Sequence, residues 1–346
     1  MTNSFTPGSS LETAAVIIAI SISCFVTVII APSIMKKMRE RGITGIDWNK
    51  KNKVEIPELG GIALLFGFPV GISIATGVLK LFDSFISTPI LAAIGALFIG
   101  GMIGIIDDIS DIPQRIKALL LSFAALPVIV AGFGDENIIL PFGYSLDFTV
   151  SSELILVYWL IIVPLGITGA ANAINMSAGY NGLETGQIVI ISLCLLICAM
   201  ITQSPIESVL IFSGIMGAAL GLNYFNGYPA VTFVGDVGTL SMGAVIGAGA
   251  IIGGLELAGL IAIFPAFFEA FSTGYHSFIK KVDRKVACTK PIIDEKGYLH
   301  TPEGAKYFTL AYLILSKRSM TERNLVRCIL GIYAIFGTLA IIISAL

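Results

Sequence analysis

Two adjacent carboxylates, Asp107 and Asp108, end a long apolar run, and Arg115 and Lys117 follow a few residues later. Adjacent carboxylates repel each other, which raises their pKa values unless a cation or base compensates. Lys117 begins the next apolar segment, where a helix N-terminus adds a positive field suited to phosphate. A solvated helix end is the alternative explanation of an isolated Asp-Asp pair. The positive groups beyond the two carboxylates suit a phosphate ligand, and the pattern alone leaves both explanations open.

A second cluster, from Asn172 to Gly186, lies between two apolar segments. It is rich in amide, carboxylate and glycine residues, which make poor lipid-facing sequence. Its candidate site residues are Asn172, Asn175, Gly179, Asn181 and Glu184. Glycine lets a ligand approach the backbone closely, and asparagine can read the edge of a base or lend an oxygen to a hard cation. A turn with helix caps is the alternative explanation of this composition.

Asp236 belongs to a third cluster, in the sequence Phe233-Val-Gly-Asp236, immediately before a glycine-rich apolar segment. One carboxylate together with substrate phosphates is the usual way in which a protein holds Mg²⁺. An aspartate that directly precedes a helix can also be its N-cap. A fourth cluster is the basic stretch 280–323, for which a solvated loop is the better interpretation of most individual residues.

Apolar helices must position these clusters. The chain of 346 residues is 55% hydrophobic and 13% charged, and its mean hydropathy is +0.91, whereas soluble domains carry about 25% charged residues. A membrane-spanning helix needs about 20 mostly apolar residues. Ten segments satisfy this requirement, at roughly 11–34, 56–80, 88–106, 116–133, 152–171, 186–202, 206–224, 238–254, 256–279 and 324–345. We therefore predict an all-α polytopic membrane protein that forms a single domain, residues 1–346, embedded in a lipid bilayer.

Charge and cysteine content exclude other classes of protein. The net charge of −2 argues against a nucleic-acid partner, which favours a basic face. The five cysteines are odd in number, and their spacing fits neither a disulfide framework nor a zinc site.

The distribution of basic residues predicts the orientation in the membrane. With ten spans, all of the 21 Lys and Arg residues except Lys80 fall on one face, which the positive-inside rule makes cytoplasmic. The four polar clusters lie at this same face. The loop 132–153 lies on the other side, and its alternating apolar residues between two glycines indicate a small external hairpin. The apolar stretch 305–316 is too short to cross the bilayer.

The order and spacing of these motifs resemble the polyprenyl-phosphate N-acetylhexosamine-1-phosphate transferase superfamily. The residues that carry the resemblance are Ile56-Pro57-Glu58, Ile105-Ile106-Asp107-Asp108 with Lys117, Asn172-Ala-Ile-Asn175 through Asn181-Gly-Leu-Glu184, and Phe233-Val-Gly-Asp236. The match is closer to the dolichyl-phosphate branch of eukaryotes and archaea than to the bacterial cell-wall enzymes. The Arg-His-Arg motif of the eukaryotic enzymes has no clear counterpart, and Arg284 and Lys285 are nearby replacements.

The resemblance implies transfer of GlcNAc-1-phosphate from UDP-GlcNAc to a polyprenyl (dolichyl) phosphate, the first step of lipid-linked oligosaccharide assembly for N-glycosylation. It implies Mg²⁺, or Mn²⁺ in its place, and an active site facing the cytoplasm in the archaeal plasma membrane or the endoplasmic reticulum. The implied catalytic residues are Asp107, Asp108, Lys117 and Asp236. The implied metal ligands are Asn175 and Asp236. The implied substrate-binding residues are Glu58, Asn172, Gly179, Asn181, Glu184, Phe233 and Arg284.

Several alternatives stay open at this point. Another UDP-N-acetyl sugar, or undecaprenyl phosphate as acceptor, would use the same chemistry. An ion-coupled secondary transporter is a more remote alternative. Transporters carry polar residues at the membrane midplane and have repeated halves, whereas the polar clusters of this chain lie at one face and no second half repeats the first. We expect the segment 280–304 to fold over the pocket and contact the sugar, with Arg284, Lys285 and Lys290 as donors. The sequence leaves open whether the protein forms a homodimer.

Overall fold

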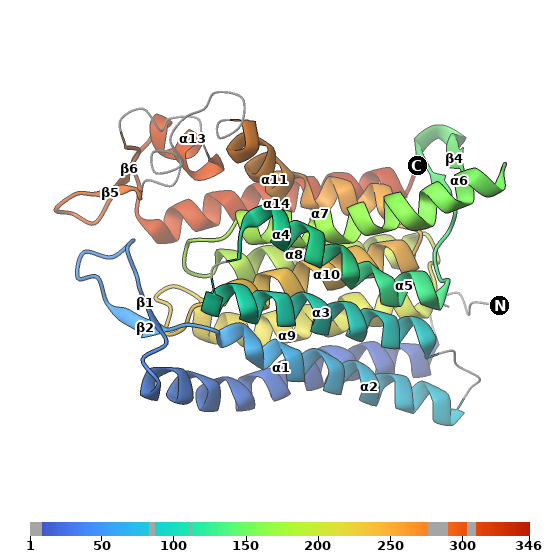
Figure 1. The fold of residues 1–346 in the computed structure, drawn as a ribbon, viewed down its shortest axis with the longest axis horizontal. Coiled ribbons are helices and arrows are strands. Elements are labelled where there is room, and N and C mark those ends of the chain that lie inside the picture. The colour runs from blue at the N-terminus through green and yellow to red at the C-terminus, as the bar shows by residue number, and fades with distance from the viewer. Residues whose placement is uncertain (1–8, 83–86, 111, 276–289, 303–308) are drawn as a thin grey trace.

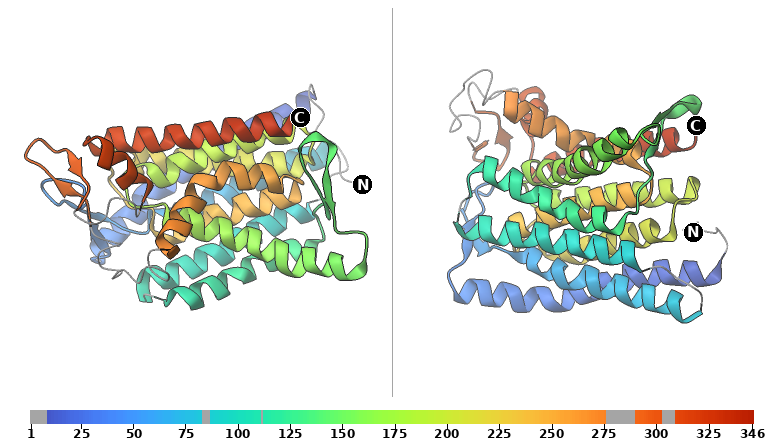
Figure 2. Two further views of the ribbon diagram at one scale, coloured as in Figure 1. Left: turned by 90° about the horizontal axis from the view of Figure 1, so that it is seen from above. Right: turned by 45° about the vertical axis from the view of Figure 1, so that its right-hand side comes forward.

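The structure is a computed structural model, and it describes residues 9–82, 87–110, 112–275, 290–302 and 309–346. Within these residues, nine helical segments are long and apolar enough to cross a membrane. Five of them are single helices of the central and C-terminal parts of the chain: α3 (Thr88–Ser110), α8 (Leu183–Ile201), α9 (Ile206–Asn226), α10 (Gly235–Ile252) and α14 (Glu322–Ser344). The helices run roughly side by side as one bundle (Figures 1 and 2). The prediction of an all-α polytopic membrane protein is confirmed.

The other four spans begin with the long N-terminal helix α1 (Ser10–Glu40). The remaining three are built from consecutive helical pieces. These are η1 with α2 (Gly60–Ala63, Leu64–Phe82), α4 with η2 and α5 (Gln114–Leu121, Ser122–Ala125, Leu126–Ala131), and α6 with the π-helical η4 and α7 (Ser152–Val157, Tyr158–Ile162, Val163–Met176). Each overlaps a predicted span, and the bounds differ by several residues at the ends of α1 and α7 and at the start of the second span.

That second span begins at Gly60 and not near residue 56 as predicted, because Ile56 and Pro57 belong to strand β2 (Glu55–Pro57). β2 pairs antiparallel with β1 (Thr44–Ile46). A count of apolar residues cannot distinguish the end of this strand from the start of the helix that follows it. The ninth predicted span, 256–279, contains helix α11 (Glu256–Gly274), which packs against α7 and α14. Within the described residues, α11 is not one of the nine segments named above.

Two more antiparallel strand pairs lie at the ends of the bundle. Strands β3 (Asn137–Ile139) and β4 (Ser145–Asp147) form the hairpin that the sequence predicts. Strands β5 (Ile292–Ile293) and β6 (Leu299–His300) pair at the other end, close to the short helix α13 (Leu310–Lys317). Figure 1 shows β1, β2, β5 and β6 together at one end of the bundle, hereafter the polar end, and β4 at the opposite end. The apolar stretch predicted to be too short for a span corresponds to α13.

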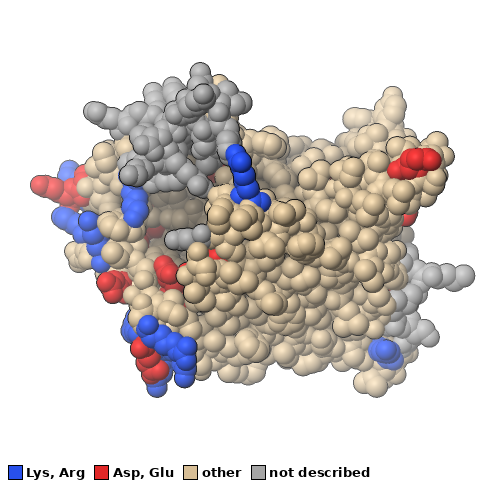
Figure 3. All heavy atoms as spheres, in the orientation of Figure 1, with Lys and Arg blue, Asp and Glu red and all other residues tan. Residues whose placement is uncertain are grey.

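Helix α10 is the centre of the bundle. Every residue from Val237 to Ile252 is buried, and α10 packs against α3, α7 and α9. The outer helices expose large apolar side chains such as Phe25, Leu91 and Leu165. Figure 3 shows the consequence on one face, a broad surface with few charges between a polar end that is rich in them and a sparsely charged opposite end. Such an exterior suits contact with lipid.

Candidate active site

The N-terminus of α10 is held by a carboxylate from another helix. Asp108, near the end of α3, accepts hydrogen bonds from the backbone N–H groups of Asp236 (2.9 Å) and Val237 (3.0 Å). The first turn of a helix leaves its N–H groups without partners inside the helix, and an oxygen that accepts from them stabilises the helix end. Asp236 itself lies inside the first turn of α10. The alternative that Asp236 is the N-cap of this helix is therefore wrong, since Asp108 provides the capping oxygens.

Glycines let two other elements approach this helix end closely. A Cβ atom on Gly104 of α3 would lie 2.4 Å from the Val237 nitrogen. A Cβ atom on Gly61 of η1 would lie 2.4 Å from the Gly238 Cα atom. Any larger residue would push α3 or η1 away from α10. The position of Asp236 is thus fixed by the backbone contacts of three elements.

Lys117 joins two of the predicted carboxylates. Its Nζ atom lies 2.6 Å from Asp107 Oδ2 and 2.7 Å from Asp236 Oδ2. The Lys117 side chain is 3% exposed and that of Asp236 is 28% exposed. The other Asp107 oxygen accepts from the Ile112 N–H at 2.8 Å. The carboxylates on either side neutralise the buried ammonium group, and one of the Asp236 oxygens stays clear of the lysine.

Asn175 connects this carboxylate cluster to a cavity. Its amide nitrogen donates to Thr239 Oγ1 at 2.9 Å, one turn after Asp236 on α10. Asn175 also lines a cavity of about 520 Å³ at the polar end. Three further predicted site residues line the same cavity: Gly179, Asn181 and Phe233. The structure therefore brings the second and third sequence clusters together around one space, with the Asp-Asp cluster beside it.

Backbone pairing holds Phe233 at the cavity. The Phe233 N–H donates to the Pro57 carbonyl at 2.9 Å, and the Gly60 N–H donates to the Phe233 carbonyl at 2.8 Å. Glu58 lies between these two contacts in the sequence, and its charge is close enough to Asp108 to interact with it. Partial burial raises the pKa of the Glu58 carboxyl above its usual value. Glu58 thus belongs to the surroundings of the carboxylate cluster.

Two predicted substrate-binding residues make contacts within the protein. Glu184 Oε1 accepts from the Gly179 N–H at 2.9 Å and so supports the loop that lines the cavity. The Asn172 amide donates to the Thr168 carbonyl of its own helix at 3.0 Å. Their roles toward substrate remain predictions, as does that of Arg284, which lies outside the described residues.

The sequence analysis missed a second polar network beside the cavity. Its members are Asp47, Asn49, Lys50 and Glu322, which meet Asn181. Lys50 forms ion pairs with Glu322 and, at 3.3 Å, with Asp47. These residues come from the loop after α1 and the start of α14, and no local pattern links segments so far apart. One sequence signal points to this region, since Thr321-Glu322-Arg323-Asn324-Leu325 resembles the eukaryotic enzymes of the superfamily named above.

Trp48 and Lys290 line the same cavity. The Lys290 Nζ atom lies 3.2 Å from the centre of the Trp48 ring. Partial burial and the charge of Lys53 lower the pKa of Lys290. Lys290, within the basic stretch 280–323, therefore reaches the cavity. Residues 276–289 lie outside the described part of the chain, and contact of the segment 280–304 with the sugar stays a prediction.

The donor atoms are suited to a hard divalent cation that is bound together with substrate. Within the described residues, no three His, Cys, Asp or Glu side chains form a ready-made metal centre. Magnesium sites in phosphate-transferring enzymes instead use one or two carboxylates plus phosphate oxygens. Asp236, with one oxygen clear of Lys117, and the neighbouring Asn175 amide fit that arrangement.

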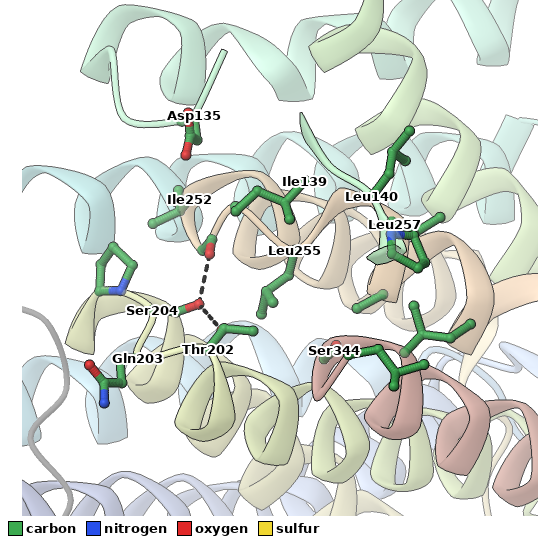
Figure 4. Close-up of a pocket in the computed structure, with 18 of the residues that line it drawn as sticks. Asp135, Ile139, Leu140, Thr202, Gln203, Ser204, Ile252, Leu255, Leu257 and Ser344 are labelled. Atoms are coloured by element: carbon green, nitrogen blue, oxygen red, sulfur yellow. Dashed lines mark hydrogen bonds between the residues drawn. The ribbon is translucent and has the colours of Figure 1, made fainter. Parts of the chain in front are cut away.

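A larger cavity, of about 700 Å³, lies at the opposite end of the bundle near the β3–β4 hairpin. Figure 4 shows Ser204 donating to the Gly253 carbonyl and pairing with Thr202 in its wall, with Asp135 at its rim. None of the predicted site residues that the structure describes lines this cavity. We therefore assign the candidate active site to the polar end.

Comparison with known proteins identifies the family of the chain. Residues 90–254, which include Asp107, Lys117, Asn175 and Asp236, match glycosyl transferase family 4. A Sulfolobus acidocaldarius protein, provisionally named a UDP-N-acetylglucosamine–dolichyl-phosphate N-acetylglucosaminephosphotransferase, is 30% identical over 94% of this chain and 95% of its own length. This chain belongs to glycosyl transferase family 4.

Other family 4 relatives differ in how much of the chain they match. A Saccharolobus solfataricus protein with the same provisional name is 31% identical over 95% of this chain and 97% of its own length. A phospho-N-acetylmuramoyl-pentapeptide-transferase of Acetivibrio thermocellus is 32% identical, but over only 64% of this chain and 66% of its own length. The archaeal relatives thus resemble this chain over nearly its whole length, well beyond residues 90–254.

Proposed function

We propose that the protein transfers GlcNAc-1-phosphate from UDP-GlcNAc to dolichyl phosphate or a related polyprenyl phosphate, releasing UMP. The observation that carries the proposal is the Asp107–Lys117–Asp236 bridge beside the cavity lined by Asn175, Asn181 and Phe233. The names of the archaeal relatives match this activity. A transporter is disfavoured because the polar cluster lies at one end of the bundle and not at its midplane.

The reaction exchanges one phosphoanhydride bond for another. An oxygen of the lipid phosphate attacks the β-phosphorus of UDP-GlcNAc, and the bond from that phosphorus to the bridging oxygen breaks, so that UMP leaves. Phosphoryl transfer depends mainly on in-line positioning and neutralisation of charge. A strong general base is not required, because a phosphate monoester has a second pKa of about 6 and its attacking oxygen is already deprotonated near neutral pH.

The chain's own residues supply the positioning and the positive charge. Lys117, held between Asp107 and Asp236, would neutralise phosphate charge beside the N-terminus of α10. Asp107 and Asp108 hold Lys117 and the α10 N-terminus in place. Asp236 and Asn175 would hold Mg²⁺ against the diphosphate, and the ion supplies further charge neutralisation there.

The nucleotide would occupy the cavity. Phe233 lines it beside Asn181 and Gly179, and its ring offers a face on which uracil can stack. Lys290 at the other wall supplies a positive charge toward the sugar or diphosphate. We propose that the polar end faces the cytoplasm, in agreement with the basic residues concentrated in its loops.

The purified protein, given UDP-GlcNAc labelled at the β-phosphate and dolichyl phosphate, should move the label into the lipid fraction and release UMP. Transfer of the sugar alone would instead leave the label in UDP. Undecaprenyl phosphate and UDP-GalNAc, supplied in parallel reactions, test the acceptor and donor alternatives. If no lipid acceptor becomes labelled in the presence of Mg²⁺ or Mn²⁺, the proposed function is wrong.

Cysteine labelling tests the proposed orientation of the protein in the membrane. In a variant without its native cysteines, a cysteine at the exposed Lys51 of the polar end should resist an impermeant maleimide in intact cells. A cysteine at Phe142 in the β3–β4 turn, which is 79% exposed, should react. Both should react after the membrane is permeabilised. The reverse pattern would show that the polar end faces outward.

A further inference from the structure

Asn181 is held by two carboxylates from distant parts of the chain. Its backbone N–H donates to Glu322 Oε1 at 2.9 Å, and its side-chain Nδ2 donates to Asp47 Oδ2 at 2.9 Å. All three residues are almost fully buried, with exposures of 3% for Asn181, 3% for Glu322 and 4% for Asp47. Both parts of Asn181 that can donate, its backbone and its side chain, therefore point to fixed acceptors.

This arrangement determines which way the amide faces. An ionised carboxylate only accepts hydrogen bonds, so the Asn181 atom next to Asp47 must be its nitrogen. Lys50 forms ion pairs with both Asp47 and Glu322 and so supplies a cation for these two buried carboxylates. The Asn181 Oδ1 atom takes the remaining position, and no residue in the described part of the chain donates to it. Because Asn181 lines the cavity, that oxygen is an acceptor for a bound ligand.

A fixed acceptor discriminates between pyrimidine bases. Uracil carries a ring N–H at position 3, which donates a hydrogen bond, whereas the same ring nitrogen of cytosine is an acceptor. An acceptor that faces another acceptor leaves both without a partner in a desolvated site, which is costly. Sites built on such buried polar groups reject ligands that lack the matching group.

We infer that Asp47 is a specificity-determining residue, which holds the Asn181 amide with its oxygen toward the cavity and thereby favours a uracil nucleotide over a cytosine nucleotide. The inference rests on the proposed function only in placing a pyrimidine nucleotide in this cavity. Asp47 acts through Asn181 and is a positioning residue. Lys50 and Glu322 belong to the same network, with Glu322 bonded to the backbone N–H of Asn181. The hydrogen bond that sets the orientation of the Asn181 side-chain amide is the one to Asp47.

Calorimetry in detergent can measure how tightly the full-length wild-type protein binds UMP, CMP and 3-methyl-UMP. These affinities test whether the ring N–H of uracil is recognised. UMP should bind about tenfold or more tightly than both of the others, since 3-methyl-UMP lacks the ring N–H and CMP reverses its polarity. If UMP does not bind, the proposed nucleotide site itself is wrong. If UMP and 3-methyl-UMP bind equally, the nucleotide site stands and the inference about Asn181 is overturned.

Asp47→Asn tests the role of Asp47, because an amide at position 47 can both donate and accept and so lets the Asn181 amide adopt the flipped orientation. The UMP-to-CMP affinity ratio should fall about tenfold toward unity. Glu322→Gln is the matched control, since it makes the same carboxylate-to-amide change in the network but leaves the Asp47–Asn181 bond intact. It should weaken both nucleotides together and preserve the ratio. An unchanged ratio in a folded Asp47→Asn protein, or an equal change of ratio in both variants, would overturn the inference.

Discussion

Asp236→Asn should reduce transfer by on the order of 10³-fold while the protein stays folded. The change removes one negative charge and keeps the size of the side chain. Asp236 contacts Lys117 at 2.7 Å and is the proposed carboxylate ligand of Mg²⁺. Its loss therefore disturbs both sources of positive charge that stabilise the transition state. The measurement is the initial rate of label transfer from UDP-GlcNAc at saturating Mg²⁺, with thermal unfolding in detergent as the check on folding.

Asp147→Asn is the matched control for this variant. Asp147 lies on β4 at the end of the bundle opposite the cluster, is exposed, and contacts the nearby Thr149. The same chemical change there should leave the transfer rate within about twofold of wild type, as for surface substitutions away from special features. If Asp236→Asn were also within this range at saturating Mg²⁺, Asp236 would be neither a metal ligand nor part of the catalytic charge balance.

The sequence predicted that Asp107, Lys117, Asn175 and Asp236 would lie at one face of the membrane, and it did so for a physical reason. Each lies near an end of a predicted spanning helix, and the count of spans puts all those ends at one face. Helices of similar length that cross one bilayer must bring such ends to a common level. The structure goes further and places Lys117 within 3 Å of both Asp107 and Asp236, a contact that a common face allows but does not require.

The role of Asp108 could not be predicted in the same way. A capping residue is normally recognised by its place directly before the helix that it caps. Asp108 instead caps α10 from the end of α3, which depends on how closely two helices pack at Gly104. The Asp47–Asn181–Glu322 network was missed for a related reason, since its three members come from three loops or helix ends. Contacts between distant segments are set by tertiary packing and leave no periodic pattern in the sequence.

The buried lysine suggests a second large effect. Lys117→Met should destabilise the protein by about 3–5 kcal/mol, because it leaves the Asp107 and Asp236 carboxylates close together without their shared cation. It should also reduce transfer on the order of 10³-fold, since the positive charge toward the diphosphate is lost. Thermal unfolding in detergent measures the first effect, and label transfer from UDP-GlcNAc measures the second.

A double variant separates these two effects. Lys117→Met combined with Asp107→Asn removes one of the two repelling charges, so the stability lost in Lys117→Met should be largely recovered. The transfer rate should stay low, because no cation replaces Lys117 next to the diphosphate. Lys80→Met, at the exposed end of α2, is the control for loss of a lysine without a buried partner and should change neither quantity. If the double variant recovered activity along with stability, Lys117 would serve only to hold the carboxylates together and would have no part in the reaction.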